Sequence, residues 1–290
     1  MKRIILTLFV LALAGCSNVP GISLGPTSTP TPTPLPPTET PIPFAISVDG
    51  TGITPSEYEA ELARYGDMLA NQNKQGSDEE VHAAVNEELI GQLLLANAAT
   101  SSGFELADSA LQDKVASITE ALGGKDKLDT WLQSNHYDMQ GFESALRRNS
   151  AAAWMRDKIS SETNKTAEQV HIQQLLLYEE DTAKYYFDQL SAGADFDTLA
   201  IQIDPVTRGD IGWFPQGYIP DQAIEAAAFG LEVGQTSEII KGDVGFYILK
   251  CLDKSPDREL SPDALAYLQK LSIQTWVLEQ KASAQIFIQP

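Results

Sequence analysis

Few residues of this 290-residue chain could carry acid–base, nucleophilic or metal chemistry. It has three histidines, His82, His136 and His171, and two cysteines, Cys16 and Cys251. His82 and His136 have no second ligand at metal-binding spacing, and the sequence contains no phosphate loop, zinc motif or serine-nucleophile motif. Cys251, within an apolar strand pattern, fits a packing thiol better than a nucleophile. We therefore predict no metal and no cofactor.

Cys16 lies at the end of a segment that resembles a bacterial lipoprotein signal. Lys2 and Arg3 precede an apolar run that is too short to span a membrane, and Leu13-Ala14-Gly15-Cys16 resembles a lipobox. The resemblance implies that residues 1–15 are removed and that Cys16 carries diacylglycerol. The alternative is a cytosolic apolar helix with an incidental cysteine.

Residues 16–43 fit a tether between a membrane and a folded body. Nine of the sixteen prolines lie between residues 17 and 43, many alternating with threonine. Such a run favours semi-rigid polyproline II with a rise of about 3.1 Å per residue. The formal net charge of −20 argues against nucleic acid as a partner. We expect an extracytoplasmic protein that reaches the membrane through its lipid anchor.

Helix signals dominate residues 54 to 163. Thr54-Pro55-Ser56-Glu57 and Ser77-Asp78-Glu79-Glu80 both fit a capping box, and apolar residues recur every four positions after the second. Ser261-Pro262 begins another long helix, and the chain closes with a strand pattern. A terminal strand needs a partner, so we predict that residues 285–288 pair with residues 45–48.

Residues 168 to 256, called the insert below, have a different pattern. Strand patterns at both ends enclose short helix patterns and a glycine-rich segment, as is typical of a compact α+β unit. We predict an α+β chain, mostly helical, with an inserted α+β domain. Its expected parts are a signal peptide (1–15), Cys16 with the tether (16–43), a helical domain (44–167) completed by a C-terminal helix and strand (257–290), and the insert (168–256).

The motifs of the insert resemble the parvulin-type, PpiC-like peptidyl-prolyl isomerase family. Gly209-Asp210-Ile211-Gly212-Trp213-Phe214 is similar to the family's G-D-L-G-W-F segment, and Ile224 to Phe229 to its F-E-x-A-A-F helix. Gly245-Phe246-Tyr247-Ile248-Leu249 is similar to its final G-Y-H-I-I strand. The flanking helices resemble the chaperone domain of SurA- and PrsA-like secreted folding factors.

The resemblance also implies which residues occupy the site. Gln174 and Tyr247 fall on the two histidine positions of the family, and Asp204 falls on its acid position. His171 would need a slip of three residues to reach the site, and an odd slip turns a strand's side chains to the other face. We therefore interpret His171 as a partly exposed strand residue and Asp210 as a turn-capping carboxylate.

An apolar proline pocket is the remaining expectation. Its predicted lining residues are Trp213, Phe214, Ile219, Pro220, Ile224 and Phe229. Rotation about the prolyl bond needs an apolar ring pocket and donors that favour a twisted amide, so loss of both histidines predicts weak or absent isomerase activity. The leading hypothesis is a membrane-anchored chaperone for unfolded or nascent secreted proteins and their Xaa-Pro segments. The alternatives are an active isomerase and a non-catalytic surface stalk or binding lipoprotein.

Overall fold

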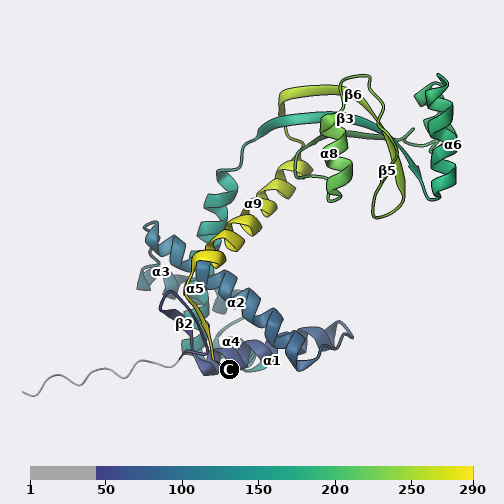
Figure 1. The fold of residues 1–290 in the computed structure, drawn as a ribbon. Coiled ribbons are helices and arrows are strands. Elements are labelled where there is room, and N and C mark those ends of the chain that lie inside the picture. The colour runs from purple at the N-terminus through teal and green to yellow at the C-terminus, as the bar shows by residue number, and fades with distance from the viewer. Residues whose placement is uncertain (1–43, 290) are drawn as a thin grey trace, which may run out of the picture. The chain divides into compact units, whose positions relative to one another are not determined.

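A computed structural model describes residues 44–289 (Figure 1). The predicted signal peptide (1–15), the lipid site Cys16 and the tether (16–43) lie outside the described residues. Across residues 44–289, no helix combines the length and the apolar character needed to cross a membrane.

Helices form most of the chain between residues 54 and 163. Their bounds are α1 Pro55–Asn71, α2 Asp78–Ser101, α3 Asp108–Leu122, α4 Lys125–Ser134 and α5 Met139–Ser161. The Thr54 side chain accepts a hydrogen bond from the Glu57 backbone N–H while Glu57 reaches back to the Thr54 N–H, and Ser77 and Glu80 repeat the arrangement at α2. Both predicted capping boxes are therefore confirmed. Each one satisfies backbone N–H donors that the start of a helix leaves without a partner.

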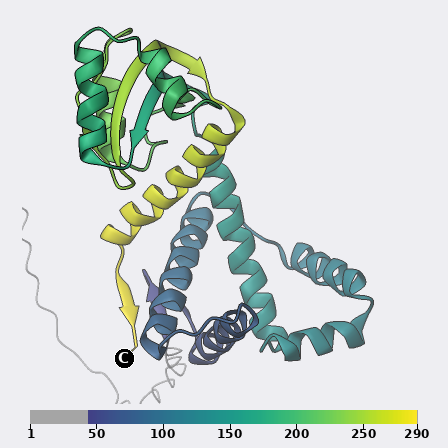
Figure 2. The same cartoon turned by 90° about the vertical axis from the view of Figure 1, so that its right-hand side faces the viewer.

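The two ends of the described chain meet in a three-stranded sheet. Strands β1 (Ile46–Val48) and β2 (Thr51–Ile53) form a hairpin around Asp49 and Gly50, which both have positive φ. Strand β7 (Ile286–Ile288) pairs antiparallel with β1, with Ile46 opposite Ile288. Figure 2 shows β7 as the yellow arrow at the C-terminus. The predicted pairing of the C-terminal strand with the first strand is confirmed.

Helix α9 (Pro262–Ser283) joins the core of the N-terminal helices. Its Ser261 caps the Ala264 N–H, as the Ser-Pro start predicts. Trp276 and Val277 of α9 pack against a cluster that contains Ile46 of β1 and Leu89 of α2. The C-terminal helix therefore completes a core that begins about 200 residues earlier in the sequence.

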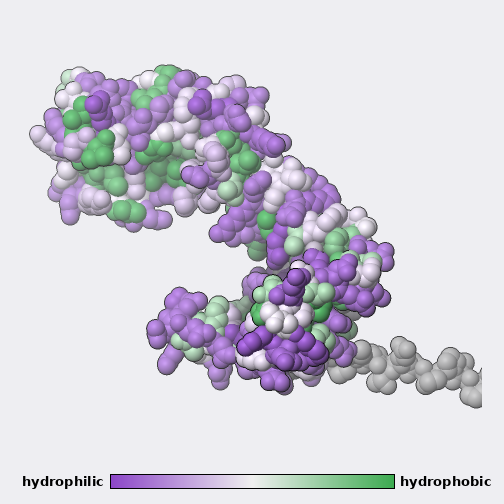
Figure 3. Space-filling model, turned by 180° about the vertical axis from the view of Figure 1, so that it is seen from behind, coloured by the Kyte–Doolittle hydropathy of each residue, from purple (hydrophilic) through white to green (hydrophobic). Residues whose placement is uncertain are grey.

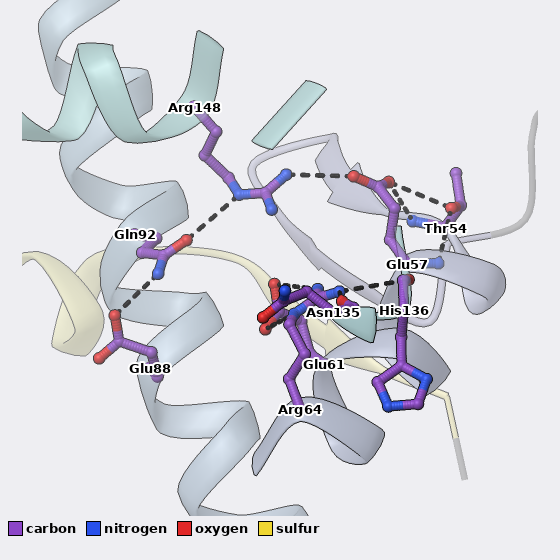
Figure 4. A network of polar contacts seen from close by, with 9 residues as sticks. All are labelled: Thr54, Glu57, Glu61, Arg64, Glu88, Gln92, Asn135, His136 and Arg148. Carbon is purple, nitrogen blue, oxygen red and sulfur yellow. Dashed lines mark hydrogen bonds and ion pairs between the residues drawn. The ribbon is translucent and has the colours of Figure 1, made fainter. Parts of the chain in front are cut away.

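A polar network ties α1 to the turn between α4 and α5 (Figure 4). The Arg64 guanidinium donates to the Asn135 carbonyl at 2.9 Å, forms an ion pair with Glu61 at 2.6 Å and lies 3.8 Å from the centre of the Tyr137 ring. Beside it, Arg148 of α5 contacts Glu57 at 3.3 Å. A cavity of about 200 Å³ lies between α1 and α5 at this network.

The insert is built on a four-stranded antiparallel sheet in the order β4-β3-β6-β5. The strands are β3 Thr166–Leu177, β4 Asp210–Pro215, β5 Ile240–Lys241 and β6 Phe246–Glu259. The helices α6 (Glu180–Ser191) and α7 (Phe196–Ile203) pack on one face through Leu175 and Ile248. Helix α8 (Gln222–Gly230) packs on the other face through Ile172 and Leu249. The result is the expected α+β fold.

One strand of the insert was not predicted. Residues 210–215, taken from the sequence as part of a glycine-rich loop, form the edge strand β4. Gly212 has positive φ (76°), and the pairing with β3 shifts between Ile172 and Gln173. Such a β-bulge breaks the simple alternation by which strands are recognised in a sequence.

Candidate functional site

The two predicted site positions on β3 and β6 lie on one face of the sheet. Gln174 is opposite Leu249, and Leu176 is opposite Tyr247. Opposed residues of adjacent strands share a face, as do residues two apart on one strand, so Gln174 and Tyr247 are diagonal neighbours. Gln174 is half-buried and Tyr247 is buried. The fold thus brings together the residues that the resemblance puts at the two histidine positions.

His171 lies on the opposite face. Its ring stacks on Trp213 with centroids 5.4 Å apart, and its Nε2 lies 2.8 Å from Asp210 Oδ1. The same carboxylate oxygen accepts the Gly212 backbone N–H at 2.8 Å, as predicted for a turn-capping aspartate. The His171 side chain is 24% exposed, which confirms the prediction of a partly exposed strand residue.

The Asp204 carboxylate is occupied by its own loop. It accepts the backbone N–H groups of Val206 at 3.0 Å and Thr207 at 3.1 Å, and it is also bonded to the Thr207 hydroxyl. These bonds, above all the one from the Thr207 hydroxyl, lower the pKa of Asp204. The loop reaches Gln174 through a backbone hydrogen bond, from the Gln174 N–H to the Gly209 carbonyl at 2.8 Å. The hydrogen bonds of the Asp204 carboxylate therefore lie within its own loop, and that loop is joined to Gln174 through the Gly209 carbonyl.

The apolar residues of the predicted pocket form one cluster with Tyr247. Phe214 and Ile224 are buried members, and Ile219 and Phe229 pack against them with partial exposure. Phe214 meets Phe229 edge-on with ring centroids 6.0 Å apart. Phe214 is 1% exposed, so it supports the site from beneath, while Ile219 and Phe229 are accessible.

Two of the predicted pocket residues do not join this cluster. Trp213 is opposite His171 in the sheet, on the other face from Phe214, and its ring lies 4.3 Å from the Arg258 guanidinium. Strand alternation is the reason, because adjacent residues point to opposite faces and only Phe214 can face α8. The prediction that Trp213 lines the pocket is corrected accordingly. Pro220 is exposed at the start of the α8 segment.

Tyr247 lies on β6, and its ring packs close to Gly242 in the loop before that strand. Burial raises the pKa of the Tyr247 hydroxyl, and the neighbouring negative charge of Asp221 acts in the same direction. A hydroxyl with a raised pKa keeps its proton at physiological pH, since its ordinary pKa is already about 10. Tyr247 can therefore donate a hydrogen bond, but it cannot act as a base near neutral pH.

Cys251 lies inside the insert away from solvent. Its side chain is free and buried, and burial raises the pKa of its thiol. This agrees with a packing thiol, because the thiol form is a poor nucleophile. In the part of the chain that the structure describes, no group of three or more His, Cys, Asp or Glu side chains is arranged to hold a metal ion.

Two carboxylates beside the cluster were missed by the sequence reasoning. Asp221 Oδ1 caps α8 by accepting the Ala223 N–H at 3.0 Å, and its Oδ2 accepts the Asp243 N–H at 3.0 Å. Glu225 accepts the N–H groups of Gly217 at 2.8 Å and Ile219 at 3.2 Å, which fixes the loop that carries Ile219. The Asp-Gln-Ala-Ile start of α8 was a usable signal for the Asp221 cap. The two loop contacts depend on tertiary structure.

Comparison with protein families gives two matches that together cover most of the chain. Residues 1–156 match the SurA-like N-terminal domain, and residues 163–253 match the PPIC-type PPIASE domain. The second match contains both Gln174 and Tyr247.

Two relatives and one solved structure are similar to this chain. The chain is 28% identical over 200 residues to "Foldase protein PrsA" of Geobacillus kaustophilus, a match covering 63% of this chain and 66% of that protein, just under two thirds. It is 40% identical over 90 residues to "Periplasmic chaperone PpiD" of Escherichia coli, covering 29% of this chain and 14% of that protein. A crystal structure of peptidylprolyl isomerase (PrsA) from Bacillus cereus aligns with a TM-score of 0.44 at 21% identity, covering 83% of this chain and 88% of that one.

Proposed function

Because the chain belongs to the family of the SurA-like N-terminal domain and carries a PPIC-type peptidyl-prolyl isomerase domain, we propose that it is an extracytoplasmic folding factor. In this proposal the helical domain (44–167 with 257–290) binds unfolded or nascent secreted proteins. The insert (168–256) receives their Xaa-Pro segments, and its isomerase activity is weak or lost. Relatives named as a foldase and a periplasmic chaperone support this function.

The face shared by Gln174 and Tyr247 carries the proposal of weak isomerase activity. Both residues adjoin an apolar cluster that a proline ring could contact through Ile219 and Phe229, but neither is an imidazole. His171 is directed to the other face and is engaged by Asp210. Losing one well-placed hydrogen-bond donor commonly lowers a rate by about a hundredfold. When two donors belong to one hydrogen-bonded unit, the rate losses from removing each of them need not add.

Binding of unfolded chains has weaker requirements, and apolar side chains on the surface of the protein support it. An apolar groove or patch among polar residues is enough to hold an extended apolar segment. Figure 3 shows green apolar side chains gathered in patches on an otherwise hydrophilic surface. Exposed large apolar residues occur in the helical domain, at Met68, Met139 and Leu278, and in the insert, at Tyr178, Val206 and Val244.

The proposal is tested by measuring isomerisation and client protection separately. We expect the full chain, purified in detergent, to turn over a Xaa-Pro peptide about a hundredfold more slowly than an ordinary parvulin. We also expect it to suppress aggregation of an unfolded client protein. Gln174→His combined with Tyr247→His should raise turnover without changing client protection. His171→Gln is the matched control, because it alters an imidazole on the opposite face.

Two outcomes would overturn the proposal. Turnover of the wild-type chain near that of ordinary parvulins would identify an active isomerase. Failure to protect any of several clients would favour a stalk or binding lipoprotein.

We also propose that Cys16 anchors the protein to a membrane through a lipid. The support is the charge, apolar run and Leu13-Ala14-Gly15-Cys16 order at the N-terminus. Cys16→Ser should leave unprocessed precursor or release the protein from membranes, whereas the wild type should partition into detergent. Mass spectrometry checks this directly, because a wild-type chain with an intact N-terminus and no mass added at Cys16 contradicts the anchor. Cys251→Ser is the control for cysteine loss.

A further inference from the structure

Three side chains converge on one point beside the Gln174–Tyr247 face. A Cβ atom placed on Gly242 would lie 2.6 Å from Asp221 Oδ2, 2.8 Å from Tyr247 Cε2 and 3.0 Å from Ile224 Cδ1. A side chain at position 242 would therefore displace at least one of these three groups, so glycine there lets them approach each other. A carboxylate is thus packed at the edge of the same apolar cluster that a proline ring would contact.

The Tyr247 hydroxyl is available to a ligand. The residue is 8% exposed, and within residues 44–289 only burial and neighbouring charges act on its hydroxyl, with no hydrogen bond to it. The hydroxyl is also not among the fully buried polar atoms that lack a partner, so it reaches solvent. A buried ring that presents an unpaired donor at the surface is poised to bond a carbonyl oxygen of a bound chain.

Negative charge surrounds this donor. The Asp243 N–H is bound to Asp221 Oδ2 at 3.0 Å, which places Asp243, an exposed residue, beside Asp221. Lys241 is a nearby cation, two residues before Asp243 in the chain. The insert as a whole has 15 acidic and 5 basic side chains, a net charge of −10. The field at the site therefore favours a cationic segment over an anionic one.

We propose that this site prefers Xaa-Pro segments in which the residue before the proline is lysine or arginine. The Tyr247 hydroxyl donates to a backbone carbonyl of the segment, and Asp221 and Asp243 face the cation. This inference rests on the proposed function, because it assumes that Xaa-Pro segments bind on the Gln174–Tyr247 face. Asp221 also caps α8, so Asp243 is the residue through which the preference is best tested.

The experiment compares three short peptides that differ only in having lysine, leucine or glutamate before the proline. Dissociation constants for the full chain in detergent are measured by NMR titration at low and high salt. We expect the lysine peptide to bind about two- to fivefold more tightly than the leucine peptide, and the glutamate peptide more weakly still, as is usual for exposed charge pairs. High salt should reduce the difference.

Matched variants separate the two parts of the inference. Asp243→Asn should reduce the preference for lysine, whereas Asp188→Asn, the same charge change on the exposed side of α6, should not. Tyr247→Phe should weaken all three peptides alike, by about two- to tenfold for one hydrogen bond. Equal binding of the three peptides, or no effect of Asp243→Asn, overturns this inference and leaves the proposed function standing. Binding of none of them overturns binding of Xaa-Pro segments by the insert, and this inference with it.

Discussion

Gly209 is the residue at which the loop after α7 touches β3. Its φ is +70°, and a Cβ atom placed on it would lie 2.0 Å from the Gln174 carbonyl oxygen. Its own carbonyl accepts the Gln174 N–H at 2.8 Å. Both the backbone conformation and the close approach therefore require glycine. The position of Gln174 in the candidate site depends on this contact.

Replacing Gly209 should be far more costly than replacing an unconstrained glycine. Gly234 also has positive φ (+85°), but a Cβ atom there would meet no other atom within 4 Å. We expect Gly234→Ala to lower the free energy of unfolding by about 1 kcal/mol, the conformational cost alone. Gly209→Ala should lower it by about 3 kcal/mol or more, because backbone must move. Denaturant unfolding measures both, and equal losses would mean that the contact with Gln174 is unimportant.

At the scale of single residues, the sequence predicted side-chain positions where it also predicted the strand. Gln174 and His171 are three apart on a continuous strand, so their opposite faces followed from the pattern. Trp213 was assigned wrongly because it was taken together with Phe214, although neighbours on a strand diverge. Asp221 and Asp243 could not be paired from sequence, since they are 22 positions apart and meet through a loop.

Arg64 joins α1 to the turn between α4 and α5 through a single side chain. Its guanidinium pairs with Glu61 of its own helix and donates to the Asn135 and His136 carbonyls after α4 (Figure 4). It also covers the Tyr137 ring. The Arg64 side chain is only 17% exposed. Planar, forked donors that also stack on an aromatic ring are specific to arginine, so lysine cannot reproduce the arrangement.

Arg64→Lys should therefore destabilise the protein although it preserves the charge. We expect a loss of about 1–3 kcal/mol in the free energy of unfolding, because the Asn135 carbonyl loses its donor in a partly buried place and the Tyr137 ring loses its planar cover. Lys125→Met is the control, since it breaks an exposed pair with Asp129 at 2.6 Å and should cost about 0.5 kcal/mol or less. Urea titration of both variants decides the matter. Equal effects would show that the network contributes no more than a surface ion pair.

At the scale of elements, the sequence predicted helices better than strands. Ser77 and Glu80 mark the start of α2 locally, and Gly123 ends α3 in the left-handed conformation, so neither boundary needs tertiary information. Strand β4 is different, because its pairing with β3 includes a bulge beside Gly212. Strand β6 continues to Glu259 through Pro256, which no apolar alternation predicts.

At the scale of the whole molecule, the hydrophobic clusters divide by sequence. The clusters around Ile172 and Leu175 contain residues of the insert. The clusters around Leu89 and Ala152 contain residues before position 160, residues of α9, and Ala284 and Ile286 just after α9. Units with separate cores generally fold separately. We therefore propose that the helical domain and the insert are independent folding units.

The chain enters and leaves the insert at adjacent points, so the proposal can be tested by excising the insert. The Leu260 N–H donates to the Lys165 carbonyl at 2.9 Å, and Ala167 is paired with Arg258. Removing residues 168–256 therefore leaves ends that a short Gly/Ser linker can join at little entropic cost. The shortened chain should remain helical and melt cooperatively, as followed by circular dichroism and calorimetry.

The matched control removes the C-terminal helix and strand instead. Deleting residues 258–290 takes Trp276, Val277 and Ile286 from the cluster that contains Ile46 and Leu89, and it leaves β1 without one of its two partner strands. Apolar surface of this kind drives association, so this truncated chain should aggregate or bind a hydrophobic dye. A stable, monomeric product of the second deletion would contradict the proposed boundaries. So would a first deletion product that no longer melts cooperatively, because the helices would then depend on the insert for their stability.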